Sequence, residues 1–116
     1  MRVILPVRND SGVMHSANLL AAKAFLNNGI RVYGYPGMTH VKAALYDGWA
    51  CIGSANFDKL SLRVNREIDL ATSDPAFVGA LERDLFLADF ARAREWNEPQ
   101  PVRWIDYLAE FFADQL

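Results

Sequence analysis

Residues 39–58 read THVKAALYDGWACIGSANFD, and this run is the most informative part of the sequence. In its middle, Asp47-Gly48 lies between two apolar runs, which is a strong signal for a β-hairpin. Side chains alternate between the two faces of a strand, so we expect His40 and Lys42 to lie on the same face of the first strand. An imidazole and an ammonium group would then stand side by side, an arrangement that suits a phosphate ester.

These residue types suit phosphate chemistry for separate reasons. A neutral imidazole at His40 can attack phosphorus and form a covalent intermediate. The Lys42 ammonium supplies a compact positive charge for the non-bridging oxygens. Ser54 and Asn56 would add hydrogen bonds to the same oxygens if the second strand returns beside the first. No Asp/His cluster has metal-ligand spacing, so we expect the positive charge to come from side chains, with no metal or other cofactor.

The run has the form H-x-K-x4-D followed by Gly-Ser-x-Asn, and it resembles the HKD motif of the phospholipase D superfamily. Residues 61–67, SLRVNRE, resemble the S-x-x-x-N-x-E segment of the same superfamily. The flanking sequence is similar to the C-terminal half of a bacterial cardiolipin-synthase-like protein. The resemblance implies an α/β fold, namely a phospholipase-D-like half domain in which helices flank a mixed β-sheet. It also implies that residues 1–116 form a single domain with one HKD motif.

The resemblance assigns roles to individual residues. His40 would be the phosphohistidine nucleophile or its partner acid, and Glu67 would orient its imidazole through a hydrogen bond. Lys42, Ser54 and Asn56 would bind the phosphate. The remaining motif positions would be structural, and they are Asp47, Gly53, Ser61 and Asn65.

Each of these features has a simpler interpretation when it is taken alone. His40 and Lys42 would be an exposed polar pair, Gly53-Ser54-Ala55-Asn56 a helix cap, and Glu67 a solvated strand residue. The five positions occur together at the spacing of the superfamily, which favours the phosphodiester interpretation.

The N-terminal third predicts a βαβ unit with parallel strands. Residues 2–7 and 30–35 have the apolar content of strands, and residues 14–28 have the apolar face of a helix. Gly29 is expected to end that helix in a left-handed conformation.

The rest of the chain predicts further strands and two helices. Strands are expected at residues 49–53 and 66–71, and a long helix at 75–96, capped by Ser73 or Asp74. A last helix is expected at residues 102–113 with an aromatic face. That face would pack on the domain, contact a partner or touch lipid at a membrane surface.

Composition limits the classes of function. Half of the 116 residues are hydrophobic, 22% are charged and the net charge is −2, which is ordinary for a globular domain and gives no overall basic field for nucleic acid. Cys51 is the single cysteine, so an internal disulfide is excluded. No run is long and apolar enough to span a bilayer and no secretory leader is visible, so we expect a cytoplasmic location or one peripheral to the inner membrane.

Only His40 stands in a catalytic setting, because His15 has no lysine two positions later. One imidazole cannot easily both attack phosphorus and protonate the leaving oxygen. We therefore expect a second HKD motif, supplied by a homodimer partner or by an N-terminal half that is missing from a truncated chain.

Three functions follow as alternatives. The first is phosphodiester hydrolysis or phosphatidyl transfer of the phospholipase D or cardiolipin synthase type, through phosphohistidine. The second is a metal-independent homodimeric nuclease, against which the modest number of basic residues argues. The third is a half domain that is inactive by itself.

Overall fold

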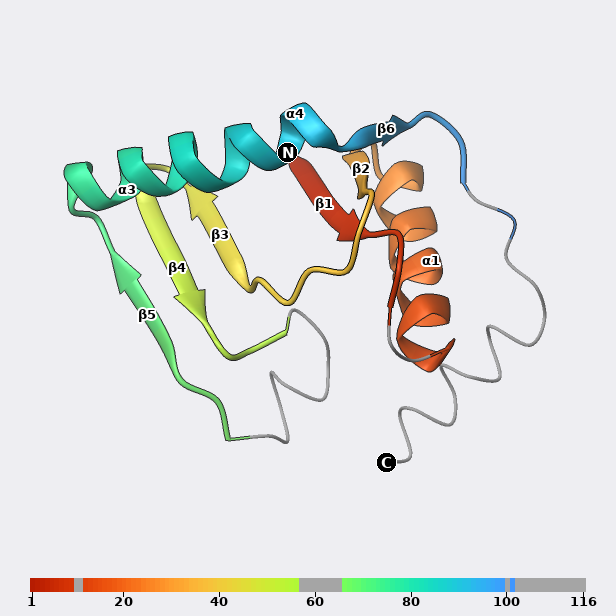
Figure 1. Cartoon of the computed structure of the whole chain (residues 1–116), viewed down its shortest axis with the longest axis horizontal. Helices are drawn as coiled ribbons and strands as arrows, with labels where there is room; N and C mark the ends of the chain where they lie inside the picture. The colour runs from red at the N-terminus through yellow and green to blue at the C-terminus, as the bar shows by residue number, and fades with distance from the viewer. Residues whose placement is uncertain (10–11, 57–65, 100, 102–116) are drawn as a thin grey trace. The chain divides into compact units, whose positions relative to one another are not determined.

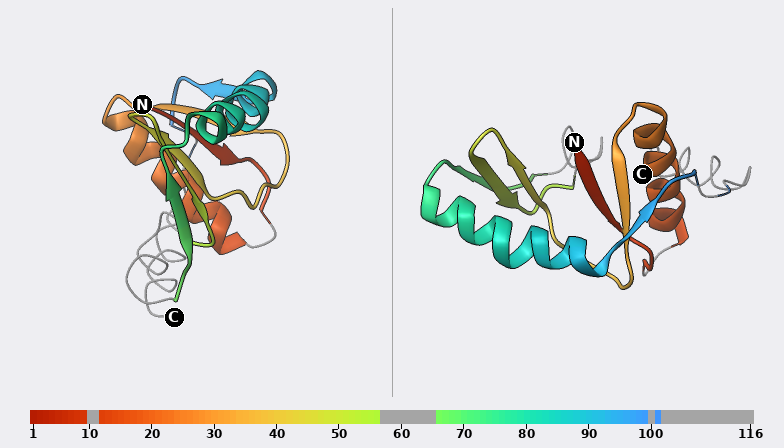
Figure 2. Two further views of the ribbon diagram at one scale, coloured as in Figure 1. Left: turned by 90° about the vertical axis from the view of Figure 1, so that its left-hand side faces the viewer. Right: turned by 90° about the horizontal axis from the view of Figure 1, so that it is seen from above.

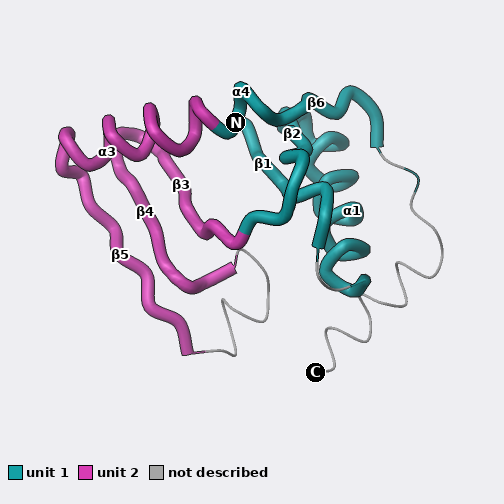
Figure 3. Tube along the Cα trace, viewed as in Figure 1, with its two compact units in different colours: residues 1–39, 89–116 teal, residues 40–88 magenta. Residues whose placement is uncertain are grey.

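The computed structural model describes residues 1–9, 12–56, 66–99 and 101. They form an α/β fold with two three-stranded sheets, β1-β2-β6 and β3-β4-β5 (Figure 1). The chain divides into two compact units, of which unit 1 comprises residues 1–39 and 89–116 and unit 2 comprises residues 40–88 (Figure 3). The elements, in chain order, are β1 (Arg2–Pro6), α1 (Gly12–Asn27), β2 (Arg31–Tyr35), β3 (Ala43–Tyr46), β4 (Trp49–Gly53), β5 (Asp69–Thr72), α3 (Pro75–Leu81), the π-helical η1 (Glu82–Leu87), α4 (Ala88–Arg92) and β6 (Arg94–Trp96).

Unit 1 contains the predicted βαβ arrangement. β1 and β2 pair in parallel from Arg2↔Arg31 to Pro6↔Tyr35, and α1 packs against both strands. Val32 is fully buried and forms part of the small core. Gly29 has φ +72°, and the N–H groups of Gly29 and Ile30 donate to carbonyls in the last turn of α1. This is a Schellman end, so the predicted glycine cap is confirmed.

β6 was not expected, and it corrects the prediction of a helix through residue 96. The helical run ends at Arg92, and residues 94–96 pair antiparallel with β2. Trp96 lies against Gly34, where an added Cβ would stand 2.6 Å from the indole nitrogen. Pairing with a strand distant in the sequence has therefore overridden the local helical pattern.

Unit 2 contains the predicted hairpin. β3 and β4 pair antiparallel, with Tyr46↔Trp49 closing the two-residue turn. Asp47 and Gly48 both have positive φ, +47° and +77°, as a type I′ turn requires. β4 has the predicted bounds, whereas β3 begins only at Ala43 and β5 only at Asp69. The prediction that His40 and Lys42 lie within the first strand is therefore wrong, since both precede it.

One helical run follows β5. Asp74 caps it by accepting a hydrogen bond from the backbone N–H of Phe77 at 2.8 Å, and Pro75 occupies its first turn. Within unit 2, α3 packs against β4, and Figure 2 shows the α3–η1 run alongside the β3–β5 sheet. Ala50 of β4 is completely buried. The helical run thus covers part of the sheet that carries the HKD-like sequence.

Some predictions fall outside the described residues. They concern Ser61, Asn65 and the last helix at 102–113. In the described part of the chain, no helix has both the length and the hydropathy that crossing a membrane would need.

Candidate functional site

His40 and Lys42 contact one another just before β3. The Lys42 Nζ lies 2.9 Å from the His40 Nδ1 and 3.0 Å from the His40 carbonyl oxygen. His40 is exposed and Lys42 half-buried. The predicted neighbourhood of imidazole and ammonium is therefore present, although both residues lie in the segment that leads into the strand.

This contact has a consequence for the proton on the imidazole. A lysine ammonium only donates hydrogen bonds, so the Nδ1 it contacts must be the accepting nitrogen. The ring proton of a neutral His40 then resides on Nε2. In this arrangement the lone pair of the His40 Nδ1 is directed at the Lys42 ammonium.

Ser54 and Glu67 form a second contact at the site. The Ser54 hydroxyl donates to the Glu67 Oε2 at 2.7 Å and accepts from the backbone N–H of Ile68 at 3.0 Å. The single hydroxyl proton of Ser54 is thus engaged by a carboxylate. Glu67, which the resemblance places on the imidazole, has Ser54 as its partner here. Its contact with His40 remains a prediction.

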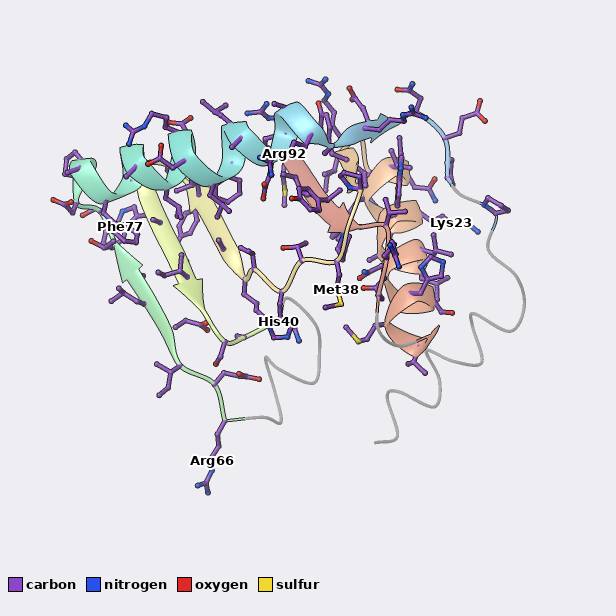
Figure 4. The ribbon with its side chains drawn as sticks, in the orientation of Figure 1. Lys23, Met38, His40, Arg66, Phe77 and Arg92 are labelled. Atoms are coloured by element: carbon purple, nitrogen blue, oxygen red, sulfur yellow. The ribbon has the colours of Figure 1, made fainter. Side chains whose placement is uncertain are left out.

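Backbone pairing brings these segments to one end of the β3–β5 sheet. The Gly53 N–H donates to the Lys42 carbonyl at 3.2 Å, and the Ser54 N–H donates to the Ile68 carbonyl at 3.0 Å. Figure 4 shows His40 at this end, where β3 and β5 begin and β4 ends. The condition set by the sequence, that the second strand returns beside the first, is met.

The other predicted residues take varied positions. Asn56 is half-buried and follows Ser54 by two residues, after β4 has ended. Asp47 lies in the hairpin turn at the opposite end of β3, as a structural residue would. Arg66, which precedes Glu67 and is given no role by the resemblance, is exposed, and Figure 4 shows its side chain directed away from His40.

Asp69 is a residue of this region that the sequence did not single out. Its Oδ1 accepts a hydrogen bond from the Ala55 N–H at 3.2 Å, and it is the register partner of Gly53. A Cβ on Gly53 would collide with the Asp69 carboxylate and with the Ile68 carbonyl. The only signal in the sequence was its position two residues after Glu67, which places both on one face of an extended segment.

Across the described ranges, no three His, Cys, Asp or Glu side chains converge in a way that could hold a metal ion. His15 is exposed on α1 in unit 1, where it borders a hollow of about 210 Å³ together with Asn18, Leu19 and Trp96.

Comparison with known proteins places these residues in a family. The sequence matches the model of the family described as cardiolipin synthase, PLD-like domain, over residues 1–86. The matched range contains every residue of the candidate site described above. No solved structure matches the chain.

The curated relatives are bacterial proteins named cardiolipin synthase A. The one from Pseudomonas fluorescens is 41% identical over 97 residues, which are 82% of this chain and 20% of the relative. The one from Pseudomonas entomophila is 40% identical over 97 residues, again 82% of this chain and 20% of the relative. The one from Pseudomonas aeruginosa is 37% identical over 112 residues, or 95% of this chain and 22% of the relative. The chain thus spans about a fifth of the length of the curated relatives it matches.

Proposed function

Because this chain belongs to the cardiolipin synthase, PLD-like domain family, we propose that its unit 2 supplies one half of a phosphodiester-transfer site. The observation that carries the proposal is the 2.9 Å contact between the His40 Nδ1 and the Lys42 Nζ. This contact supports the proposal, because an imidazole and an ammonium group lie within the span of one phosphate group.

The first step is capture of the phosphate by Lys42. A phosphodiester carries a full negative charge on its non-bridging oxygens, so it is a better partner for an ammonium than a neutral ring nitrogen is. Lys42 turns from the His40 Nδ1 to the phosphate, and the imidazole lone pair is released. Asn56 adds a hydrogen bond from its side-chain amide.

The second step is attack on phosphorus. One ring nitrogen of His40 forms a bond to phosphorus, the bond to the leaving oxygen breaks, and that oxygen departs with its electron pair. Glu67 accepts a hydrogen bond from the other ring nitrogen and stabilises the positive charge that develops on the ring. A carboxylate has about four acceptor positions, so the bond from Ser54 leaves capacity for this role.

The third step requires a second imidazole. The leaving oxygen of an ordinary ester needs a proton, and His40 cannot donate one while it attacks. A second HKD motif, from another copy or another polypeptide segment, protonates the leaving group. It then activates the water or alcohol that displaces the phosphoryl group from His40.

The substrate that we propose is a phospholipid, and the reaction is phosphatidyl transfer or hydrolysis. The relatives' name, cardiolipin synthase A, supports this choice over a nucleic acid. The net charge of −2 supports it as well, because a nuclease gains affinity from a basic surface. A phospholipid substrate would bring the protein to the surface of a membrane.

A phosphodiesterase assay tests this function. Cleavage of bis-p-nitrophenyl phosphate in the presence of a chelator should occur with the unaltered chain and disappear with His40→Ala. Preference for phospholipid vesicles over plasmid DNA should follow under the same conditions. Cleavage that survives His40→Ala would exclude the proposed site, and a preference for DNA would favour the nuclease.

A further inference from the structure

We infer that Asp69 is a positioning residue that fixes the path of the chain from Gly53 to Asn56, and thereby places Asn56 at the phosphate. The inference rests on the proposed function for the role of Asn56. The contact that carries it, between the Asp69 carboxylate and the Ala55 N–H, is independent of that function.

The backbone after β4 needs a hydrogen-bond partner that the sheet does not provide. The ladder between β4 and β5 extends to the bond from the Ser54 N–H to the Ile68 carbonyl. The next N–H belongs to Ala55, which is only 8% exposed, and a buried N–H without a partner is costly. The Asp69 Oδ1 accepts this hydrogen bond at 3.2 Å, so a side chain continues the ladder by one residue.

Gly53 makes this arrangement possible. It is the register partner of Asp69, and the Asp69 carboxylate lies where a Cβ of residue 53 would be. Any larger residue at position 53 would displace the carboxylate from Ala55. This explains in physical terms why glycine precedes Ser54 in the motif, although its backbone does not require positive φ.

These hydrogen bonds also affect the two residues that flank Ala55. Ser54 is held by Glu67 and Ile68, and Ala55 is held by Asp69, so the exit from β4 is fixed on two consecutive residues. Asn56 is the next residue, and its direction follows from theirs. Asp69 acts here through an oxygen that accepts a hydrogen bond, and a neutral side-chain oxygen can fill the same role.

The test compares Asp69→Ala with Asp69→Asn in the full chain labelled with ¹⁵N. The asparagine retains a side-chain oxygen that can accept from Ala55, whereas alanine does not. With Asp69→Ala, the Ala55 amide should exchange with solvent roughly 5- to 10-fold faster, as expected for loss of one net hydrogen bond. The Asn56 side-chain amide signal should shift, and inorganic phosphate should bind several-fold more weakly. Asp69→Asn should stay close to the unaltered chain in all three measurements.

Asp84→Ala serves as the matched control, because it also removes an exposed aspartate from unit 2. Unchanged Ala55 exchange and Asn56 signals in Asp69→Ala would overturn the inference. The inference would also be overturned if Asp69→Asn changed the Ala55 exchange and the Asn56 signal as much as Asp69→Ala does, because the negative charge would then be required. Should Asp69→Ala fail to fold, the comparison between Asp69→Asn and the unaltered chain decides, because Ala55 protection must survive in the asparagine variant. If the unaltered chain binds no phosphate, the proposed function fails, while the Ala55 exchange still tests the role of Asp69.

Discussion

The chemistry that we propose depends on the contact between His40 and Lys42. The ammonium lies 2.9 Å from the ring nitrogen, so the imidazole is held in one tautomer until Lys42 finds a better acceptor. A phosphate oxygen is such an acceptor. In the chemistry that we propose, binding of the phosphate and activation of His40 are therefore the same event.

Lys42→Ala should lower turnover of bis-p-nitrophenyl phosphate by about 10²-fold or more, as loss of a charge that stabilises the transition state does elsewhere. The fold should persist, because Lys42 is outside the strand and its backbone bond to Gly53 does not need the side chain. Steady-state kinetics and far-UV circular dichroism measure the two effects. Lys42→Arg is the control that keeps the charge, and it should retain part of the activity. Full turnover by Lys42→Ala would contradict the phosphate role.

The contact between His40 and Lys42 could be predicted from the sequence, but the partners of Ser54 and the contact of Asp69 could not. His40 and Lys42 were predicted as neighbours because they are two positions apart, and they are neighbours. The partner of Ser54 depends on which segment lies beside β4, and local sequence does not specify this pairing. Asp69 was missed for the same reason, since its role arises only from its register with Gly53.

At the scale of elements, the hairpin turn is the feature that the sequence determined most directly. Asp-Gly favours positive φ at two successive residues, and the structure has Asp47 and Gly48 in that conformation. β6, in contrast, is a strand because of Gly34 and Arg31, which are about sixty positions away in the sequence. Helical periodicity at residues 93–96 carried no information about these partners.

Asp47→Val should destabilise the domain by about 1–2 kcal/mol, because a β-branched residue resists positive φ more than aspartate does. Asp47→Asn should be nearly neutral, since asparagine tolerates this conformation. Both variants should bind inorganic phosphate like the unaltered chain, because Asp47 shapes the turn and lies outside the site. Urea denaturation and phosphate titration make the two comparisons. Loss of phosphate binding in Asp47→Asn would show that this carboxylate acts at the site.

β6 is joined to β2 by a pH-sensitive ion pair. Arg31 donates two hydrogen bonds to Glu95, at 2.7 and 2.8 Å, and these bonds together with the guanidinium charge lower the pKa of Glu95. A lowered pKa in the folded state means that the stabilisation is complete above the ordinary glutamate pKa of about 4.3 and is lost as the pH falls through the lowered value.

Glu95→Gln should therefore be less stable than the unaltered chain at pH 7, with a difference that shrinks as the pH falls below about 4. The effect should be modest, because the Arg31 side chain is 58% exposed and the Glu95 side chain 34%, so solvent screens the pair. Denaturation midpoints between pH 3 and 7 provide the measurement. Asp84→Asn is the control, since Asp84 pairs with its sequence neighbour Arg83 and that pair can form in the unfolded chain too. A constant difference across this pH range would contradict the ion-pair explanation.

At the scale of the whole molecule, the chain carries one half of the chemistry that we propose. It contains one HKD-like motif and spans about a fifth of the length of the relatives it matches. The sequence predicted the family and the α/β class, because motif spacing and apolar periodicity are local properties. The division of the strands into two sheets follows from pairings between distant segments, which local patterns do not report.

If a second copy supplies the second imidazole, replacing part of the unaltered chain by His40→Ala at constant total concentration should lower the activity by more than the fraction replaced. Each productive pair needs two intact histidines, so activity should follow the square of the fraction of unaltered chains. Mixing with Asp47→Asn should cause no such loss. Phospholipid vesicles serve as the substrate in this assay, because the leaving alcohol of a phospholipid needs a proton. Light scattering measures the size of the protein complex. A linear dependence on that fraction would exclude pairing between copies.

The most direct test is detection of the phosphorylated histidine itself. The p-nitrophenolate ion leaves without a proton, so bis-p-nitrophenyl phosphate should modify His40 even where the second imidazole is absent. Mass spectrometry of the chain after rapid alkaline quenching should find one p-nitrophenyl phosphoryl adduct, on the peptide that contains His40, together with a burst of nitrophenolate of about one equivalent. Sustained release of nitrophenolate by the unaltered chain, with no adduct on His40, would contradict the covalent mechanism.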